Sequence, residues 1–372
     1  MSYGGGARAP EIRIDQLTGL RTIIAPGRAS RPQALDLRPA GEAAPADDAG
    51  ECPLCAGNEE MTPPEVWASR RDGAADSPGW SQRAVPNLYP ALVPGEHAGG
   101  GSAIGAAAAG GSEAGMTSSA DPLRTSSRVT TVDLFGAAAA EGAHEVIANH
   151  PEHRTRLIDL GADGLAGAMA AWRTRVAAHS ATAPYVQLIV NEGAAAGASL
   201  SHSHAQLYAL PFVPAEIARE RERFNAYHER TLGSHLLEDV VVEEVRRRDR
   251  LVAFDSEAIL FCPWASRSPF ELRLAPRSPA PRFEQDERGA AMLMTALTAL
   301  ARVFGETPQL NLWVRTAPRG TEEFHWHIDI VPRLGTKAGF ELGTGVDIDV
   351  YPPEQAAAEL RAVVADPPAA AG

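Results

Sequence analysis

Two histidines and a glutamine alternate in the segment His202-Ser-His-Ala-Gln206, directly after a loop of small residues. The loop, residues 191–199, is rich in glycine and alanine, and small residues let backbone N–H groups approach a phosphate closely. In an extended strand, His202, His204 and Gln206 would project from one face. A neutral imidazole is a nucleophile toward phosphorus, and an amide can hold a phosphoryl oxygen. The segment therefore indicates phosphate chemistry.

The cysteines suggest a metal site. Cys52 and Cys55 form a C-x-x-C pair among proline, glycine and acidic residues. A redox pair of this spacing usually begins a helix after a strand, so half of a zinc site is favoured here over a redox motif. Cys262 lies alone in an apolar segment and is predicted to be a buried thiol. Three cysteines make no disulfide framework.

Length and charge limit the classes of function. The chain has 372 residues, which is normal for two fused halves, and 44% of them are hydrophobic, enough for a substantial core. A net charge of −13 argues against a nucleic-acid surface, which needs basic patches. No stretch resembles a signal peptide or is long and apolar enough to span a bilayer, so a cytoplasmic protein is expected, with no membrane partner.

The first half of the chain alternates between strand and helix patterns. Residues 95–127 are rich in Gly, Ala and Ser and are interpreted as a disordered or mobile insertion. The elements expected here are a hairpin within residues 10–40 turned at Thr18-Gly19, strands near residues 127–134, 144–148 and 185–190, and a helix from Leu160 to Ala178.

The second half repeats this order. Pro214 is favourable at the start of a long polar helix that would extend from Ala215 to about Leu237. The elements expected next are strands near residues 241–245, 251–255, 258–262 and 270–274, a helix over 286–304, strands near 309–316 and 325–332, and a helix over 353–364. The strand near 325–332 carries a second H-x-H, His325-Trp-His327. The repeated order predicts an internal duplication.

Eight segments, in order, identify a family. They are residues 10–19, 25–32, 52–58, 61–65, 87–91, 151–153, 197–204 and 339–341. Together they resemble the galactose-1-phosphate uridylyltransferase family of the histidine-triad superfamily. Ser203, where uridylyltransferases usually have proline, and the run 339–345 resemble the ADP-glucose phosphorylase branch.

This resemblance implies an α+β fold of two tandem histidine-triad-like halves, each an antiparallel sheet flanked by helices, usually assembled as a homodimer. The N-terminal half, with the zinc site and the nucleophile, would span residues 1–213. The C-terminal half would span residues 214–366, followed by a tail over residues 367–372.

The resemblance also implies the site residues. His204 would be the nucleophile, with Gln206 and Ser199 on the transferred phosphate. The nucleophile's other ring nitrogen should donate to a backbone carbonyl in the H-x-H segment. The expected substrate-binding residues are Arg28, Arg31, Asn87, Asn191, Gly197, Lys337 and Glu341. Asp347 falls where a glutamine that contacts the hexose is expected.

Four residues match the zinc ligands of the family: Cys52, Cys55, His153 and His202. Such a Cys₂His₂ set closes a tetrahedral site without an open position, so the zinc would be structural. His144 and His150 are near enough in sequence to compete with His153. Glu220, His325 and His327 could supply three ligands of a second metal, Fe or Zn, but residues 311–318 contain no histidine for the fourth, so this second metal is not expected.

The expected activity is nucleotidyl transfer, in the EC 2.7.7 class. A nucleoside monophosphate would move between hexose 1-phosphates through a covalent nucleotidyl-histidine, with UDP-glucose as donor and galactose 1-phosphate as acceptor. The partners would therefore be a nucleotide sugar, a sugar 1-phosphate and a second copy of the chain. The alternatives are an ADP-glucose phosphorylase that transfers AMP to phosphate, a dinucleotide hydrolase, and a non-catalytic nucleotide-binding protein.

Overall fold

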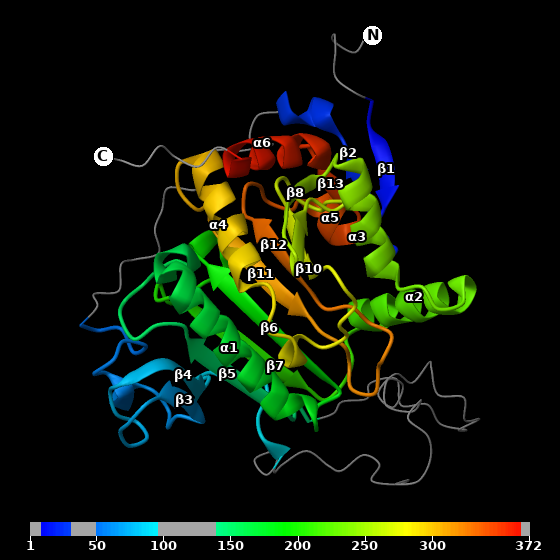
Figure 1. Ribbon diagram of the computed structural model, residues 1–372. Coiled ribbons are helices and arrows are strands. Elements are labelled where there is room, and N and C mark those ends of the chain that lie inside the picture. Colours follow the sequence, from blue (N-terminus) through cyan, green and yellow to red (C-terminus); the bar gives the residue numbers. More distant parts are fainter. Residues whose placement is uncertain (1–8, 31–49, 96–138, 366–372) are drawn as a thin grey trace, which may run out of the picture.

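A computed structural model describes residues 9–30, 50–95 and 139–365 (Figure 1). Almost all of the predicted 95–127 insertion, the predicted strand near 127–134, the tail over 367–372 and Arg31 lie outside these ranges. Within them, no helix combines the length and the apolar character that crossing a bilayer requires.

One sheet of ten strands forms the centre of the molecule (Figure 1). All neighbouring strands are antiparallel, and the sheet order is β3-β4-β5-β7-β6-β11-β12-β10-β9-β8. The strands are β3 (Trp67–Arg70), β4 (Trp80–Pro86), β5 (Ala143–Ala148), β6 (Tyr185–Glu192), β7 (His204–Leu210), β8 (Leu251–Phe254), β9 (Ala258–Phe261), β10 (Leu272–Pro276), β11 (Leu310–Arg315) and β12 (His327–Pro332).

The sheet repeats the same topology on both sides of the β6–β11 pair. The first half has the strands β3 to β7 and the second half the strands β8 to β12, five each. From the central pair outward, the order in each half is fourth, fifth, third, second and first strand. The helix α1 (Gly161–Ser180) joins the third and fourth strands of the first half, and α4 (Ala290–Phe304) does so in the second. The duplicated α+β architecture is therefore confirmed. The division between residues 213 and 214 remains a prediction, since the sheet continues across it.

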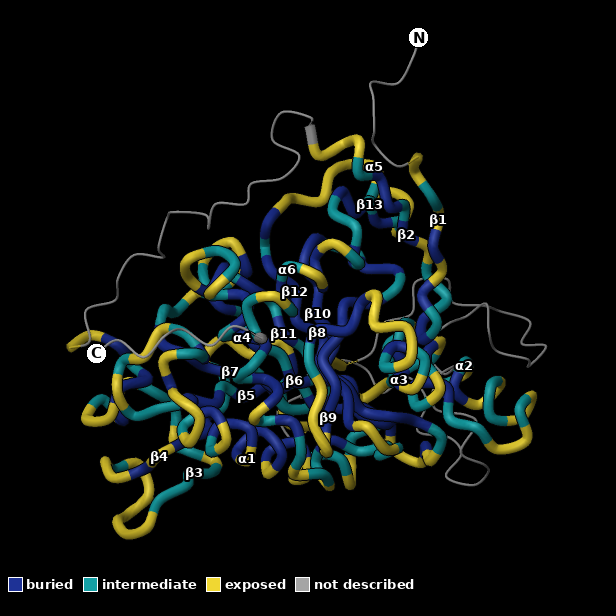
Figure 2. Tube along the Cα trace, turned by 45° about the horizontal axis from the view of Figure 1, so that its top comes forward, coloured by how far each residue is buried: buried dark blue, intermediate teal, exposed yellow. Residues whose placement is uncertain are grey.

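The main core lies on the face of the sheet that α1, α4 and α6 (Pro353–Ala365) cover (Figures 1 and 2). A row of paired residues crosses the centre of this face: Ala205, Val190, Leu312 and Ile330, all buried. Burying one large aliphatic side chain contributes about 1.5–3 kcal/mol. Alternate residues of the same strands point to the opposite face, which is left for polar side chains.

The helical region after β7 differs from the prediction. The single helix over 215–237 and the strand near 241–245 are wrong, because the chain forms α2 (Ala215–Thr231) and α3 (Leu236–Arg247). The break occurs at Leu232 and Gly233, whose φ angles are 59° and 118°. Leu237 and Val241 are buried at helical spacing in α3. The run of β-branched valines favoured a strand, and packing of the helix overrides that local preference.

A second, small sheet joins the two ends of the chain. The predicted hairpin is confirmed as β1 (Glu11–Ile14) and β2 (Arg21–Ile24), and β2 also pairs in parallel with β13 (Asp347–Asp349). The 3-10 helix η1 (Pro26–Ser30) follows β2, and the short helix α5 (Gly339–Thr344) precedes β13. This pairing brings Arg28 to the segment that contains Lys337 and Glu341.

The other predicted elements occur with shifted ends. The helix expected from Asp286 begins at Ala290, after Gly289 in a left-handed conformation. The strand expected from His325 begins at His327, so the second H-x-H lies at the start of β12, just as the first lies at the start of β7. The elements β3, β4, β13 and α5 have no counterpart in the predicted set.

Candidate active site and metal centre

His204 is the first residue of β7 and is buried, with 4% of its surface exposed. Its Nδ1 lies 2.7 Å from the backbone carbonyl oxygen of His202. A carbonyl only accepts, so Nδ1 carries the proton and Nε2 keeps its lone pair. The expected bond within the H-x-H segment is therefore present. Burial lowers the pKa of His204, which keeps the imidazole neutral and nucleophilic at neutral pH.

The strand register places polar residues beside His204 on the face opposite the main core. Gln206, Ile189 and Trp313 form one row across β7, β6 and β11. One residue further along, Asn191 of β6 pairs with Asn311 of β11. Asn191 directly follows Val190, the partner of Ala205, so it lies beside His204. The fold thus brings the predicted His204, Gln206 and Asn191 together.

The small-residue loop after β6 is held by its own hydrogen bonds. The N–H groups of Ala196 and Ala198 donate to the Gly193 carbonyl, and that of Gly197 donates to the Ala194 carbonyl. These three amides are therefore used within the loop, and the expectation that other N–H groups of the loop approach a phosphate stays a prediction. Gly197 itself has a φ of 86°, which favours glycine. Ser199 is exposed, as is Gly197, and both follow the 3-10 turn η6 (Ala194–Ala196).

Gln206 is oriented by two residues that the sequence analysis did not assign to it. The Tyr208 hydroxyl donates to Gln206 Oε1 at 3.0 Å, and His144 Nε2 lies 3.2 Å from the same oxygen. The Ala91 N–H donates to His144 Nδ1, so Nε2 carries the proton and donates to Gln206. The Gln206 carbonyl is thus occupied, and its NH₂ group is the part that can donate to a phosphoryl oxygen.

These two residues act as a unit. The rings of His144 and Tyr208 stack with centroids 4.1 Å apart. Asn87 Nδ2 lies 3.1 Å from His144 Nε2, so the predicted Asn87 is a neighbour of this pair, although an Nε2 that donates to Gln206 cannot also accept a hydrogen bond from the Asn87 NH₂ group. A sequence signal existed, because Tyr208 alternates with Gln206 on β7 and pairs with His144 on β5. His144 belongs to this network and not to the metal site.

Tyr208→Phe is expected to lower kcat about three- to tenfold with little change in KM. It removes one hydrogen bond of about 0.5–1.5 kcal/mol that orients Gln206. Steady-state kinetics with a saturating donor measures this effect. Tyr89→Phe is the matched control, because Tyr89 is 85% exposed. Equal kcat values for both variants would contradict the orienting role.

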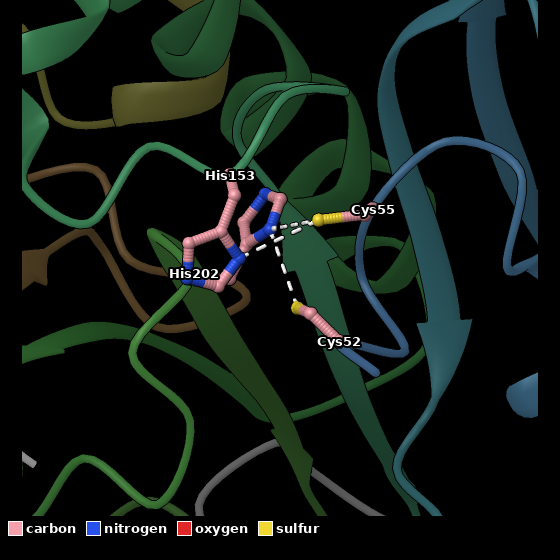
Figure 3. A group of neighbouring side chains, drawn as sticks. All are labelled: Cys52, Cys55, His153 and His202. Carbon is pink, nitrogen blue, oxygen red and sulfur yellow. Dashed lines mark hydrogen bonds between the residues drawn. The ribbon is translucent and has the colours of Figure 1, made fainter. Parts of the chain in front are cut away.

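The four predicted metal ligands converge on one point (Figure 3). Their ligand atoms all lie within 4.8 Å of one another. The Nδ1 atom of His202 is 3.5 Å from the sulfur atoms of both Cys52 and Cys55, and His153 Nδ1 is 3.4 Å from Cys55 Sγ. A tetrahedral zinc ion separates its sulfur and nitrogen ligands by about 3.6 Å. The arrangement fits a metal ion.

Groups around these ligands favour the same conclusion. His202 Nε2 donates to the His150 carbonyl at 2.8 Å, and His153 Nε2 lies 3.1 Å from Ser201 Oγ, so both Nδ1 atoms are directed to the metal position. Burial lowers the pKa of His202 to about 4, which keeps it neutral. Burial and the neighbouring Cys52 raise the pKa of Cys55 to about 12, so the thiolate form needs a cation. His150 contributes only its carbonyl.

Three of the predicted substrate-binding residues line a separate cavity of about 560 Å³: Arg28, Lys337 and Glu341. Lys337 Nζ is 2.6 Å from an Asp347 carboxylate oxygen. Asp347, which stands where a glutamine that contacts the hexose is expected, therefore forms an ion pair with this lysine. Asn311 also lines the cavity and donates to both Asn191 and the Ala196 carbonyl at 2.8 Å. The cavity therefore borders the face that carries His204.

The second H-x-H has the geometry of the first but a different setting. His327 Nδ1 lies 3.1 Å from the His325 carbonyl, as His204 does from His202. Its Nε2 is 3.4 Å from Glu220 Oε1. Asp329 stands where Gln206 stands in the first half and pairs with Arg273 at 2.7 Å. Ion pairs thus fill this position, and it is not an open site.

Glu220, His325 and His327 are the residues considered above for a second metal. Among the described residues, the groups whose ligand atoms lie within 4.8 Å of one another include none of these three. Arg315 of β11 instead pairs with Glu216 at 2.6 Å beside them.

Comparisons with known proteins match this fold and site. The family described as galactose-1-phosphate uridyl transferase, N-terminal domain, matches residues 116–214. The ADP-glucose phosphorylase of Arabidopsis thaliana is 29% identical over 96% of this chain and 93% of its own length. The galactose-1-phosphate uridylyltransferase of Haemophilus influenzae is 30% identical over 62% of this chain and 70% of its own length. The crystal structure of the Arabidopsis phosphorylase with bound ADP-glucose has a TM-score of 0.72 and covers 96% of this chain and 99% of that one.

The two histidine-triad-like halves and these relatives define a nucleotidyl-transferring enzyme. The chain belongs to the galactose-1-phosphate uridylyltransferase family.

Proposed function

We propose that this enzyme transfers a nucleoside monophosphate from a nucleotide sugar through a covalent bond to His204. In the first step, the Nε2 lone pair of His204 attacks the α-phosphorus, and the bond to the sugar 1-phosphate oxygen breaks. In the second step, an acceptor oxygen attacks the same phosphorus, and the bond to Nε2 breaks. The observation that carries this proposal is the buried, neutral His204, whose proton is held on Nδ1 by the His202 carbonyl.

The neighbouring residues would stabilise the transferred phosphoryl group. The NH₂ group of Gln206 is the donor that its own contacts leave available. Asn191 lies on the same face, and Ser199 follows in the next loop. Hydrogen bonds aimed at charge that develops on the phosphoryl oxygens accelerate transfer.

A zinc ion fits the Cys52, Cys55, His153 and His202 set, and we propose that it is structural. When bound, it would neutralise the thiolates and close a four-ligand site. The Ser203 N–H donates to the Arg154 carbonyl at 2.6 Å, and the Asn149 N–H donates to the Ser203 carbonyl at 3.1 Å. These bonds connect the metal-binding segments directly to the start of β7, and so to the position of His204.

A homodimer is part of this proposal. Arg28 and Lys337 carry positive charges suited to a phosphate, and the Glu341 carboxylate can accept hydrogen bonds from sugar hydroxyl groups, but among the described residues that line their cavity, His204 and Gln206 are absent. A second copy of the chain would let these residues complete the site of its partner. Light scattering of the purified protein measures the mass of the assembly, and a monomer at working concentration would contradict the proposal.

Two donors are candidates. UDP-glucose, with galactose 1-phosphate as acceptor, follows from membership of the family. ADP-glucose, with inorganic phosphate as acceptor, is favoured by the Arabidopsis phosphorylase, which matches 96% of this chain, whereas the Haemophilus uridylyltransferase matches 62%. Ser203 between the two histidines favours the same branch.

Intact-protein mass spectrometry distinguishes the two donors. The protein is incubated briefly with UDP-glucose, or separately with ADP-glucose, without an acceptor. We expect a nucleotidyl adduct from the true donor, and its removal on addition of galactose 1-phosphate or phosphate identifies the acceptor. Absence of an adduct from both donors, when binding is confirmed by calorimetry, would contradict a covalent mechanism with either nucleotide sugar.

A further inference from the structure

A second cluster of metal-binding side chains lies away from the proposed active site. His228 is in the last turn of α2, His235 directly precedes α3, and Glu323 is in the loop before β12. Their ligand atoms lie within 4.8 Å of one another, and all three residues are partly buried. We propose that these three residues form a further binding site for a divalent transition metal such as zinc.

The distances favour a metal ion over a simple ion pair. His228 Nδ1 and His235 Nδ1 lie 3.2 Å and 3.4 Å from the same carboxylate oxygen, Glu323 Oε2. A hydrogen bond from a charged nitrogen to a carboxylate is about 2.7–2.9 Å long, so both separations are longer than that. Zinc bonds of about 2.0–2.1 Å in a tetrahedron separate two ligand atoms by about 3.3 Å. The observed separations match two edges of such a tetrahedron.

The backbone around the three ligands is held by one buried cluster. Phe224 lies one turn before His228, Leu236 follows His235, and Phe324 follows Glu323. All three apolar side chains belong to the same core cluster, and the rings of Phe224 and Phe324 are 4.9 Å apart. The Gly233 N–H donates to the His228 carbonyl at 2.9 Å, which fixes the turn between the helices. The ligands are therefore positioned before a metal binds.

The two metal clusters can be compared through the internal duplication. In the first half, the metal centre connects the Cys52–Cys55 loop, which precedes the first strand β3, with His202, which precedes the fifth strand β7. In the second half, His235 precedes the first strand β8, and Glu323 precedes the fifth strand β12. The residue that corresponds to His202 is His325, which is not one of the three ligands, so the new cluster is not a ligand-by-ligand repeat of the first and the proposal depends on its own geometry.

The chemistry of the two sites should differ. The first has two cysteines and two histidines, which satisfy four-coordinate zinc. The second has two imidazoles and one carboxylate, so one coordination position is left for water or a small ligand. We therefore expect the second ion to exchange more readily with chelators than the first.

Metal analysis of the purified full-length protein tests the proposal. The protein is equilibrated with micromolar zinc and freed of unbound metal by gel filtration. The bound zinc per chain is then measured by elemental mass spectrometry. We expect His235→Ala and Glu323→Gln to hold one equivalent fewer than wild type. Glu322→Gln is the matched control, because Glu322 is the exposed neighbour of Glu323. Circular dichroism and thermal unfolding establish that each variant is folded.

Cobalt(II) identifies which site is lost. Thiolate ligands give a charge-transfer absorption with cobalt, and only the Cys52–Cys55 site contains thiolates. We expect His235→Ala and Glu323→Gln to keep this absorption while they lose one equivalent of cobalt. Equal metal content in wild type and in both variants would overturn the proposal. Loss of the thiolate absorption in the two variants would also overturn it, because the ion lost would then be the one at the Cys52–Cys55 site.

Discussion

Replacement of His204 by alanine is expected to abolish the covalent adduct and to lower kcat by on the order of 10⁴-fold or more. The imidazole is the only part of this residue that can form the bond to phosphorus, and Nε2 is the nitrogen that the His202 carbonyl leaves unprotonated. Intact-protein mass spectrometry with the labelling donor measures the adduct, and steady-state kinetics measures the loss of turnover.

His327→Ala is the matched control for this prediction. His327 has the same type of bond to a carbonyl two residues before it, and it is equally buried in the repeated half. Both variants remove a buried imidazole, so their stabilities should fall by comparable amounts, but only His204→Ala should lose the adduct. Substantial turnover by a folded His204→Ala protein would show that another group attacks the phosphorus.

Replacement of Cys52 by serine is expected to release the metal ion and to lower the free energy of unfolding by several kcal/mol. Cys52 is completely buried, and its sulfur is one of four ligand atoms that converge. Binding of a structural zinc ion is coupled to folding, so loss of a ligand transfers much of the binding free energy into a loss of stability. Metal analysis and denaturant unfolding measure the two effects.

Cys262→Ser is the control for the cysteine prediction. Cys262 is also completely buried but belongs to the main apolar core, and burial raises its pKa well above the usual range. This variant should lose some stability from packing but keep its full metal content. Retention of zinc by Cys52→Ser, or equal metal loss in both variants, would contradict the four-ligand set.

Local sequence patterns were enough to predict the parts of the site that lie close together in the chain. The H-x-H-x-Q run predicts the imidazole of His204 and the amide of Gln206 on one face of a strand. The strand β7 begins at His204, and side chains two residues apart in a strand point to the same face. The hairpin turned at Thr18-Gly19, the helix α1 and the strand β6 follow from similar short-range patterns. The same reasoning gave a wrong strand near residues 241–245, where a run of valines follows a polar helical segment. The segment is the helix α3 instead, because Val241 is buried in the core at a helical position.

The remaining parts of the site depend on contacts between distant segments. His144 and Gln206, which are in contact, are 62 positions apart in the sequence, and the candidate metal ligands Cys52 and His202 are 150 positions apart. Motif resemblance identified the second pair, but nothing in the local pattern assigned the first. Arg28 reaches the cavity of Lys337 only because β13 pairs with β2.

The sequence by itself thus predicted the proposed reacting groups, the candidate metal ligands and the duplicated order of elements, because these predictions depend on residue type and on spacing along the chain. The tertiary structure decided which nitrogen of His204 is unprotonated, which end of Gln206 is left to donate a hydrogen bond, and how His228, His235 and Glu323 converge. These features depend on hydrogen bonds and packing across strands and loops. Such contacts form only when the two halves of the sheet are in register.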